Sequence, residues 1–259
     1  MNISQSGIWA TVLAAASSLA IAAPAAAEVP LIWASIRASH NQVALVTARG
    51  QARSVASPES FNRFNPEDTL TTGLQARAEV LFNEGSLLRI GEQTSLNFWP
   101  DHRLLRLSQG TAAVFVPPGQ GRTVIETPTT RIGLNSNGVV VRYVPSRGLT
   151  LVMALANPLT GPVSITTAIS GQDIALYAGQ MALIGTSDIQ IVEFDLREFY
   201  QTSPLMADLK IGNGAYRPAH DEPLALLRPE LRAALDRQTP FTGEEEILNP
   251  TLIGNLGDF

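Results

Sequence analysis

The feature that most constrains this chain is a succession of short β-type runs between about Ile36 and Ile191. Their centres recur every ~8 to 12 residues, and Gly, Pro, Asn and Ser separate them. This spacing is typical of a sandwich, roll or solenoid-like β domain, whereas alternating βα units need longer intervals. The region is therefore predicted to be all-β, built from many short strands.

The pattern of apolar residues within these runs predicts how the strands are buried. In "AEVLF" the alternation places Ala78, Val80 and Phe82 on one face. The runs at 111–117 and 138–144, "TAAVFVP" and "GVVVRYV", are apolar on both faces. Strands of that kind are predicted to lie between two layers of structure.

The stretch "NEGSLLRIGE", residues 83–92, predicts a tight turn that leads into a strand. Gly85 is expected to adopt a positive φ, and Leu88 and Ile90 to share one face of the strand. The turn residues provide no catalytic dyad. The stretch is therefore interpreted as part of a repeated strand-and-turn architecture.

Helical periodicity begins only near the C-terminus. The segments 193–209 and 222–238 carry leucines and aromatics at helical spacing, and Pro229 either splits the second pattern or starts a new turn. Residues 211–223 have the composition of a flexible connector, and the chain after Gln238 reads as an acidic, poorly packed tail. The prediction is a β domain with a C-terminal helical appendage.

The N-terminus has the features of a secretory signal peptide. An uncharged apolar run at residues 8–23 is followed by Pro24 and small residues, which predicts cleavage after Ala27. The alternative is an uncleaved anchor, but the run is Ala-rich and shorter than a membrane-spanning helix requires. We expect a periplasmic or secreted protein without a membrane span after cleavage, organised as signal peptide 1–27, β domain 28–200, and helical appendage and acidic tail 201–259.

Composition excludes several function classes. The chain is 45% hydrophobic and only 16% charged, so it is expected to fold. Its net charge of −5, without a Lys/Arg cluster, disfavours nucleic acid and anionic lipid as partners. The absence of cysteine rules out a disulfide framework, thiol catalysis and thiolate metal ligands.

The titratable residues form no catalytic or metal-binding pattern. His40, His102 and His220 are far apart in the sequence, and Asp101 beside His102 is interpreted as part of a turn. The glycines of "PPGQGRT" are followed by neither a Lys nor a helix, and 244–246 is typical of a solvated acidic run. We therefore expect no enzymatic activity, no metal and no cofactor.

The order of turns and strands resembles the FecR domain family over about residues 40 to 200. The resemblance rests on an Asp-x-Leu-x-Thr element, a small-residue strand, a Gly-Ser turn, a Gly-centred strand pair, a Thr-Pro element and a Gly-Gln element. These are found at Asp68, Leu70 and Thr72, at Ala76 and Ala78, at Gly85 and Ser86, in "LLRLSQGTAAVFV", at Thr127 and Pro128, and at Gly179, Gln180 and Met181. The motifs are structural, and the resemblance implies a binding domain.

The chain departs from the family in two respects. It has "NSNG" at 135–138 where a Gly-Thr or Gly-Ser pair is usual, and Glu67 where a Gly is usual. The best-known FecR proteins also carry a cytoplasmic anti-sigma region and a transmembrane helix before the domain, and this sequence shows neither. We therefore expect no transmembrane signalling by this chain alone.

Three hypotheses remain for the function. The first is an exported FecR-like domain that binds an unidentified envelope protein or polymer, as sensor accessory or scaffold. Its candidate partner-binding residues lie in the aromatic segment 193–206, at Phe194, Leu196, Phe199 and Tyr200, although the same segment could instead cap an edge or open end of the β domain. The others are a carbohydrate-processing hydrolase, with Glu79 and Glu84 converging across a cleft, and a purely structural envelope protein.

Overall fold

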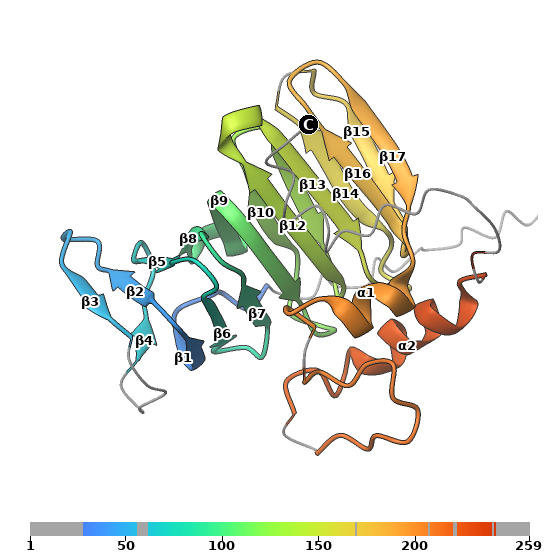
Figure 1. The fold of residues 1–259 in the computed structure, drawn as a ribbon, viewed down its shortest axis with the longest axis horizontal. Helices are drawn as coiled ribbons and strands as arrows, with labels where there is room; N and C mark the ends of the chain where they lie inside the picture. The colour runs from blue at the N-terminus through green and yellow to red at the C-terminus, as the bar shows by residue number, and fades with distance from the viewer. Residues whose placement is uncertain are drawn as a thin grey trace, which may run out of the picture.

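A computed structural model of the chain confirms the predicted all-β fold with helices at its C-terminal end (Figure 1). The expected signal peptide and almost all of the acidic tail lie outside the described residues. The structure describes residues 28–55, 62–168, 170–206, 208–219, 222–239 and 241.

The strands of the described residues form two sheets. Sheet A is antiparallel throughout, with β4 (Arg63–Phe64) beside its first strand. Its strands, in spatial order, are β1 (Ala34–His40), β6 (Arg77–Phe82), β7 (Leu87–Ile90), the second half of β9 (Leu104–Phe115), β12 (Gly138–Val144), β13 (Leu149–Ala154), β16 (Gln180–Ile184) and β17 (Ile189–Glu193).

Sheet B faces the inner side of sheet A. Its pairings are antiparallel except for the parallel pair of β9 and β10. Its strands, in order, are β3 (Ala52–Ser54), β2 (Val43–Val46), β5 (Thr69–Thr72), β8 (Ser95–Trp99), the first half of β9, β10 (Thr123–Glu126), β11 (Thr130–Leu134), β14 (Val163–Thr167) and β15 (Asp173–Leu176).

One strand belongs to both sheets. The first half of β9 pairs with β8 and β10 in sheet B, and its second half pairs with β7 and β12 in sheet A. The change of sheet occurs at Gly110, which has φ +84°, and a Cβ there would lie 2.3 Å from the hydroxyl oxygen of Thr94. The Thr94 hydroxyl accepts a hydrogen bond from the Thr111 amide at 3.0 Å. Only glycine allows this close approach.

The main core fills the space between the two sheets. The predicted shared face of Ala78, Val80 and Phe82 is buried there, as are Leu88 and Ile90 of the following strand. Gly85 has φ +97°, as predicted for the turn between these strands. The period-2 pattern of the sequence therefore identified the inward residues correctly.

A helical layer covers the outer face of sheet A. It consists of α1 (Leu196–Thr202) and α2 (Arg228–Arg237), which lie at the lower ends of β12 to β17 in Figure 1. A second apolar cluster joins these helices to outward residues of β9, β12, β13 and β16. Because sheet B covers one side of β12 and the helices cover the other, this strand is buried on both faces, as its sequence predicts.

Local interactions set the bounds of the two helices. The Asp195 side chain accepts hydrogen bonds from the Arg197 and Glu198 amides and so caps α1. Pro229 lies in the first turn of α2, so it starts this helix and does not split it. The Gln238 side chain, just after α2, donates to the Phe194 carbonyl at 2.7 Å and accepts from the Leu196 amide at 2.9 Å. This pair of hydrogen bonds fastens the end of α2 to the start of α1.

Candidate binding groove

A groove of about 400 Å³ lies on the outer face of sheet A, beside the C-terminal end of α1. Its apolar lining includes Val140, Leu151 and Met153 from the sheet, and Phe199 and Leu205 from the helical layer. Strand alternation explains the sheet residues, because every second residue of β12 and β13 points toward the helices. The helical layer leaves this part of the apolar face accessible as a groove.

Charged side chains also line the groove. Arg142 extends from β12, and Glu92, Arg77 and His40 come from the ends of neighbouring strands and turns. Arg142 is half-buried and donates a hydrogen bond at 3.4 Å to the hydroxyl of Thr111, its direct cross-strand neighbour. Burial lowers the pKa of Arg142, and the Glu92 carboxylate opposes this effect. A guanidinium remains charged under such conditions, so the groove combines a cation with an apolar surface.

The wall of the groove after α1 is held by an ion pair. Arg89 donates a hydrogen bond to the Leu205 carbonyl at 3.1 Å, and its guanidinium lies 2.6 Å from the Glu79 carboxylate. The Ser203 amide donates to the Phe199 carbonyl at 3.0 Å. Residues of sheet A therefore position the segment that shapes the groove.

The structure brings together the four residues proposed from the sequence to bind a partner. Phe194, Leu196, Phe199 and Tyr200 are all buried between the helical layer and sheet A, and only Phe199 also lines the groove. The Tyr200 hydroxyl donates to the Leu155 carbonyl at 3.4 Å, and burial raises the pKa of this tyrosine. Their segment covers a face of the sheet, where the sequence interpretation placed it at an edge or open end. Partner binding through them stays a prediction.

The charged residues of the groove were not among the binding residues proposed from the sequence. Arg142 was visible as the one charged residue in "GVVVRYV", a strand predicted to be buried on both faces. A charge in such a strand marks a position where the covering layer is incomplete or a partner group is present. Glu92, Arg77 and His40 gave no comparable signal, because their approach depends on how the sheet edges and turns meet.

The carboxylates considered for hydrolysis each interact with a different arginine. Glu79 pairs with Arg89, whereas Glu84 pairs with Arg103 at 2.7 Å inside the fold. Asp101 begins a short 3₁₀ turn, η1 (Asp101–Arg103), in agreement with the turn interpretation. Among the described residues no group of three His, Asp or Glu side chains could hold a metal ion. Neither is any helix in the described ranges long and apolar enough to cross a bilayer.

Comparisons with known proteins give a family match for the central part of the chain. Residues 68–154 match the family described as FecR protein, a range that runs from β5 to β13 and includes the floor strands of the groove. No curated protein matches the chain.

Two crystal structures of a candidate anti-sigma factor from Parabacteroides distasonis ATCC 8503, at 1.65 and 2.50 Å resolution, are also similar. Each has a TM-score of 0.44 and 12% sequence identity to this chain. The alignments cover 50% and 52% of this chain but 61% and 64% of the solved chains, which is less than two thirds of their length. The family match therefore shows that residues 68–154 are similar to the FecR protein family.

Proposed function

We propose that this protein is a non-catalytic binding module of the cell envelope, a sensor accessory or scaffold. In this proposal its groove holds an anionic, apolar segment of another envelope component. The observation that carries the proposal is the half-buried Arg142 beside the apolar floor of the groove. A carboxylate of the partner would interact with the Arg142 and Arg77 side chains while apolar side chains of the partner cover Leu151 and Met153.

Two further observations support a binding role. The FecR domain contains the floor strands, so the groove is built on the part of the chain that matches the family. The candidate carboxylates Glu79 and Glu84 are each engaged by an arginine, which disfavours the alternative of a hydrolase in which the two converge. The expected signal peptide supports an envelope setting.

Site-specific photocrosslinking in the native envelope tests this proposal. A benzophenone side chain at Pro204, which is exposed and lines the groove, should give one discrete adduct. The same group at Leu159, fully exposed in a different loop, should not give that adduct. The adduct should be lost in the Arg142→Gln variant and kept in the Arg131→Gln variant, since Arg131 is an exposed arginine on sheet B. An adduct that survives Arg142→Gln, or none at all, would refute the proposed use of the groove.

A further inference from the structure

The two ends of the sandwich differ in how their edge strands are protected. At one end, β4 covers part of β1, whose register with β6 is broken between Ile36 and Ala38, and β3 has only three residues, one of them Arg53. Irregular register, short length and positive charge are devices that prevent edge strands from pairing with other chains. The first end therefore has several forms of protection.

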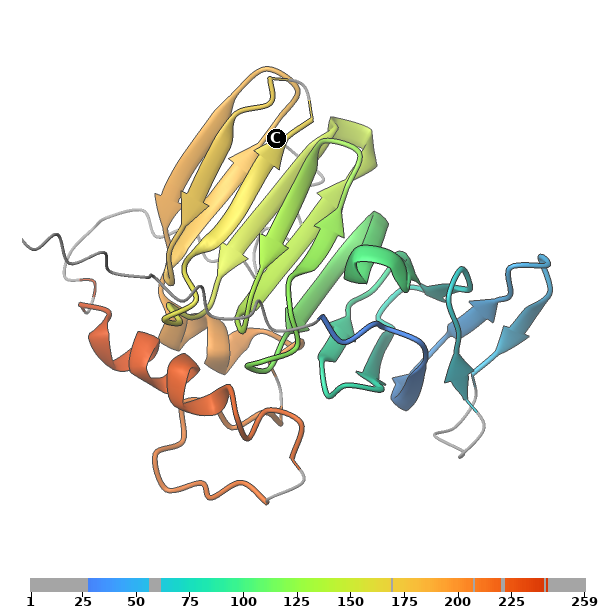
Figure 2. The ribbon, with the colours of Figure 1, turned by 180° about the vertical axis from the view of Figure 1, so that it is seen from behind.

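At the opposite end, β15 has only four residues, whereas β17 has neither an irregular register nor a positive charge. Figures 1 and 2 show both strands at the far side of the molecule from β1 to β3. Within the described part of the chain, β17 pairs only with β16 and β15 only with β14. The five residues of β17 pair in continuous register and include neither proline nor a basic residue. Such an edge is a template for an additional strand.

The hydrogen-bond pattern shows which amides of β17 face the open side. The Gly185 amide bonds to the Asp188 carbonyl, and the Phe194 amide bonds to the Gly179 carbonyl, so these residues form hydrogen-bonded pairs of the β16–β17 hairpin. Hydrogen-bonded and non-hydrogen-bonded pairs alternate along an antiparallel ladder. Ile191 falls in a non-hydrogen-bonded pair, and its N–H therefore points away from β16 toward the open edge.

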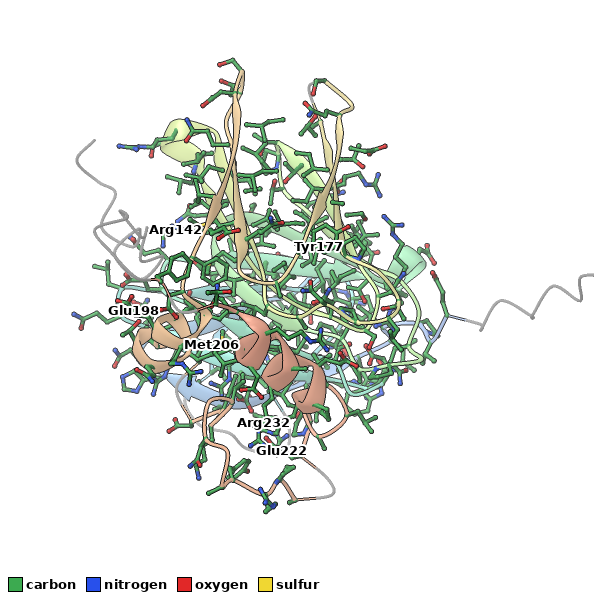
Figure 3. All side chains as sticks on the ribbon, turned by 90° about the vertical axis from the view of Figure 1, so that its right-hand side faces the viewer. Arg142, Tyr177, Glu198, Met206, Glu222 and Arg232 are labelled. Atoms are coloured by element: carbon green, nitrogen blue, oxygen red, sulfur yellow. The ribbon has the colours of Figure 1, made fainter. Side chains whose placement is uncertain are left out.

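An opening lined by both polar and apolar side chains lies between the two edge strands. It has a volume of about 580 Å³, and its lining includes Ile174 of β15 together with Ile184, Ile189 and Ile191 of the β16–β17 hairpin. Figure 3 shows the β14–β15 and β16–β17 hairpins as two separate prongs above the helical layer. Ile191 is 48% exposed although it faces the space between the sheets. Ile174 and Ile184 in the same opening are buried, so Ile191 at the β17 edge is its most exposed apolar side chain.

The β14–β15 and β16–β17 hairpins carry acidic but no basic side chains, and this charge favours a basic partner. Residues 148 to 196 contain no lysine, arginine or histidine, and their acidic residues are Asp173, Asp188, Glu193 and Asp195. Asp188 and Asp195 flank β17 on its two sides in the sequence. A second copy of the chain would bring these carboxylates together, whereas a basic segment would complement them.

We propose that β17 accepts an extended segment of a partner protein, with alternating apolar and basic residues, as an added strand of sheet A. Backbone hydrogen bonds to the Ile191 amide and its neighbours hold the segment in register. Its apolar side chains enter the opening beside Ile174 and Ile191, and its basic side chains interact with the acids around β17. This surface is separate from the groove, and the proposal does not depend on the function assigned to the groove.

A labelled ten-residue peptide of alternating isoleucine and lysine is a direct probe, with binding to the full chain measured by fluorescence anisotropy. It should bind at least ten-fold more tightly than a peptide with glutamate in place of lysine, and its affinity should fall as salt is raised. Methylation of its backbone nitrogens should abolish binding, because an added strand requires those donors. Hydrogen exchange at the Ile191 amide should slow when the peptide binds.

Ile191→Lys should weaken peptide binding by at least ten-fold, because an inward lysine blocks the edge. Ile191 is half-exposed, so the melting temperature of this variant should be unchanged, and Leu159→Lys is the matched control at an exposed site elsewhere. The proposal would be overturned if the glutamate peptide or the methylated peptide bound as tightly as the lysine peptide. It would also be overturned if the Ile191→Lys variant bound the lysine peptide as tightly as the wild-type chain does. A concentration-dependent dimer abolished by Ile191→Lys would assign the edge to a second copy instead. Arg142→Gln should leave peptide binding unchanged, which separates this surface from the groove.

Discussion

At the scale of single residues, Arg103 holds together segments that are distant in the sequence. Its guanidinium donates to the Glu84 carboxylate at 2.7 Å, to the Thr123 hydroxyl at 3.1 Å and to the Val29 carbonyl. The side chains of Arg103 and Glu84 are each only 1% exposed. The turn between β6 and β7 is therefore fixed to the start of the fold and to β10 by one buried cation.

Replacing Arg103 with methionine should destabilise the protein by about 3 to 5 kcal/mol, because it leaves the Glu84 carboxylate buried without its counter-charge. The free energy of unfolding from a denaturant titration measures the loss. The control is Arg106→Met. The Arg106 side chain is 49% exposed in its pair with Glu126, so this substitution should lower the unfolding free energy by less than about 1 kcal/mol. If both variants lose the same small amount, the buried pair does not have this structural role.

Gly85 allows a prediction based on backbone conformation alone. With φ +97°, a valine at this position should cost roughly 1 to 3 kcal/mol of unfolding free energy through backbone strain. A Cβ would meet only the Pro117 side chain, at 3.7 Å, so packing adds little to this cost. Gly85→Asn should cost less, since asparagine tolerates positive φ better than a β-branched residue. Equal stability of wild type and Gly85→Val in urea would contradict the argument.

At the scale of elements, α1 is a short helix whose stability comes from tertiary packing. Its seven residues are too few to form a stable helix alone. Its buried side chains belong to the apolar cluster that also contains residues of sheet A and α2. The Phe199 ring packs edge-on against the Phe194 ring, with centroids 5.9 Å apart. Phe199 therefore has two roles, because it packs against sheet A and also lines the groove.

Phe199→Ala should lower the unfolding free energy by about 3 to 5 kcal/mol, since it removes a buried ring from the layer between α1 and the sheet. Chemical denaturation measures this change, and Leu159→Ala, at a fully exposed position, is the matched control. If stability holds while the partner adduct disappears, Phe199 acts as a binding residue and not as part of the cover.

The elements also show what the sequence could predict. Alternation in residues 77–82 and the doubly apolar run at 138–144 specified burial correctly, because local spacing determines which face a side chain occupies. The passage of β9 between sheets was not visible, because it depends on contact of Gly110 with Thr94 in another strand. The groove was missed for the same reason, since Arg142 and Phe199 line one groove only after the helical layer has packed.

At the scale of the whole molecule, the start of the described chain is already part of the fold. The Val29 amide donates to the Gln120 carbonyl at 3.1 Å, and the Asn83 side chain accepts from the Ile32 amide at 2.9 Å. Cleavage after Ala27, as expected from the sequence, would leave these contacts intact.

The protein isolated from the envelope fraction should therefore lack residues 1–27, and its intact mass should be that of residues 28–259. The formal net charge contributed by side chains should remain −5, because no charged side chain occurs in that segment. Mass spectrometry of the isolated protein measures this, with the protein made without export as the uncleaved reference. A mass that retains Met1 would show that the segment is not removed.

The strand β9, which is shared by the two sheets, also bears on how the protein unfolds. In a sandwich whose sheets are joined only by loops, one layer can open while the other persists. Here Gly110 joins the two halves of a single strand, so detaching either layer breaks hydrogen bonds in both. We expect the calorimetric and van't Hoff enthalpies of the β domain to agree, because it unfolds as one cooperative unit. Unfolding of strands at one end of the sandwich should then be coupled to unfolding at the other end.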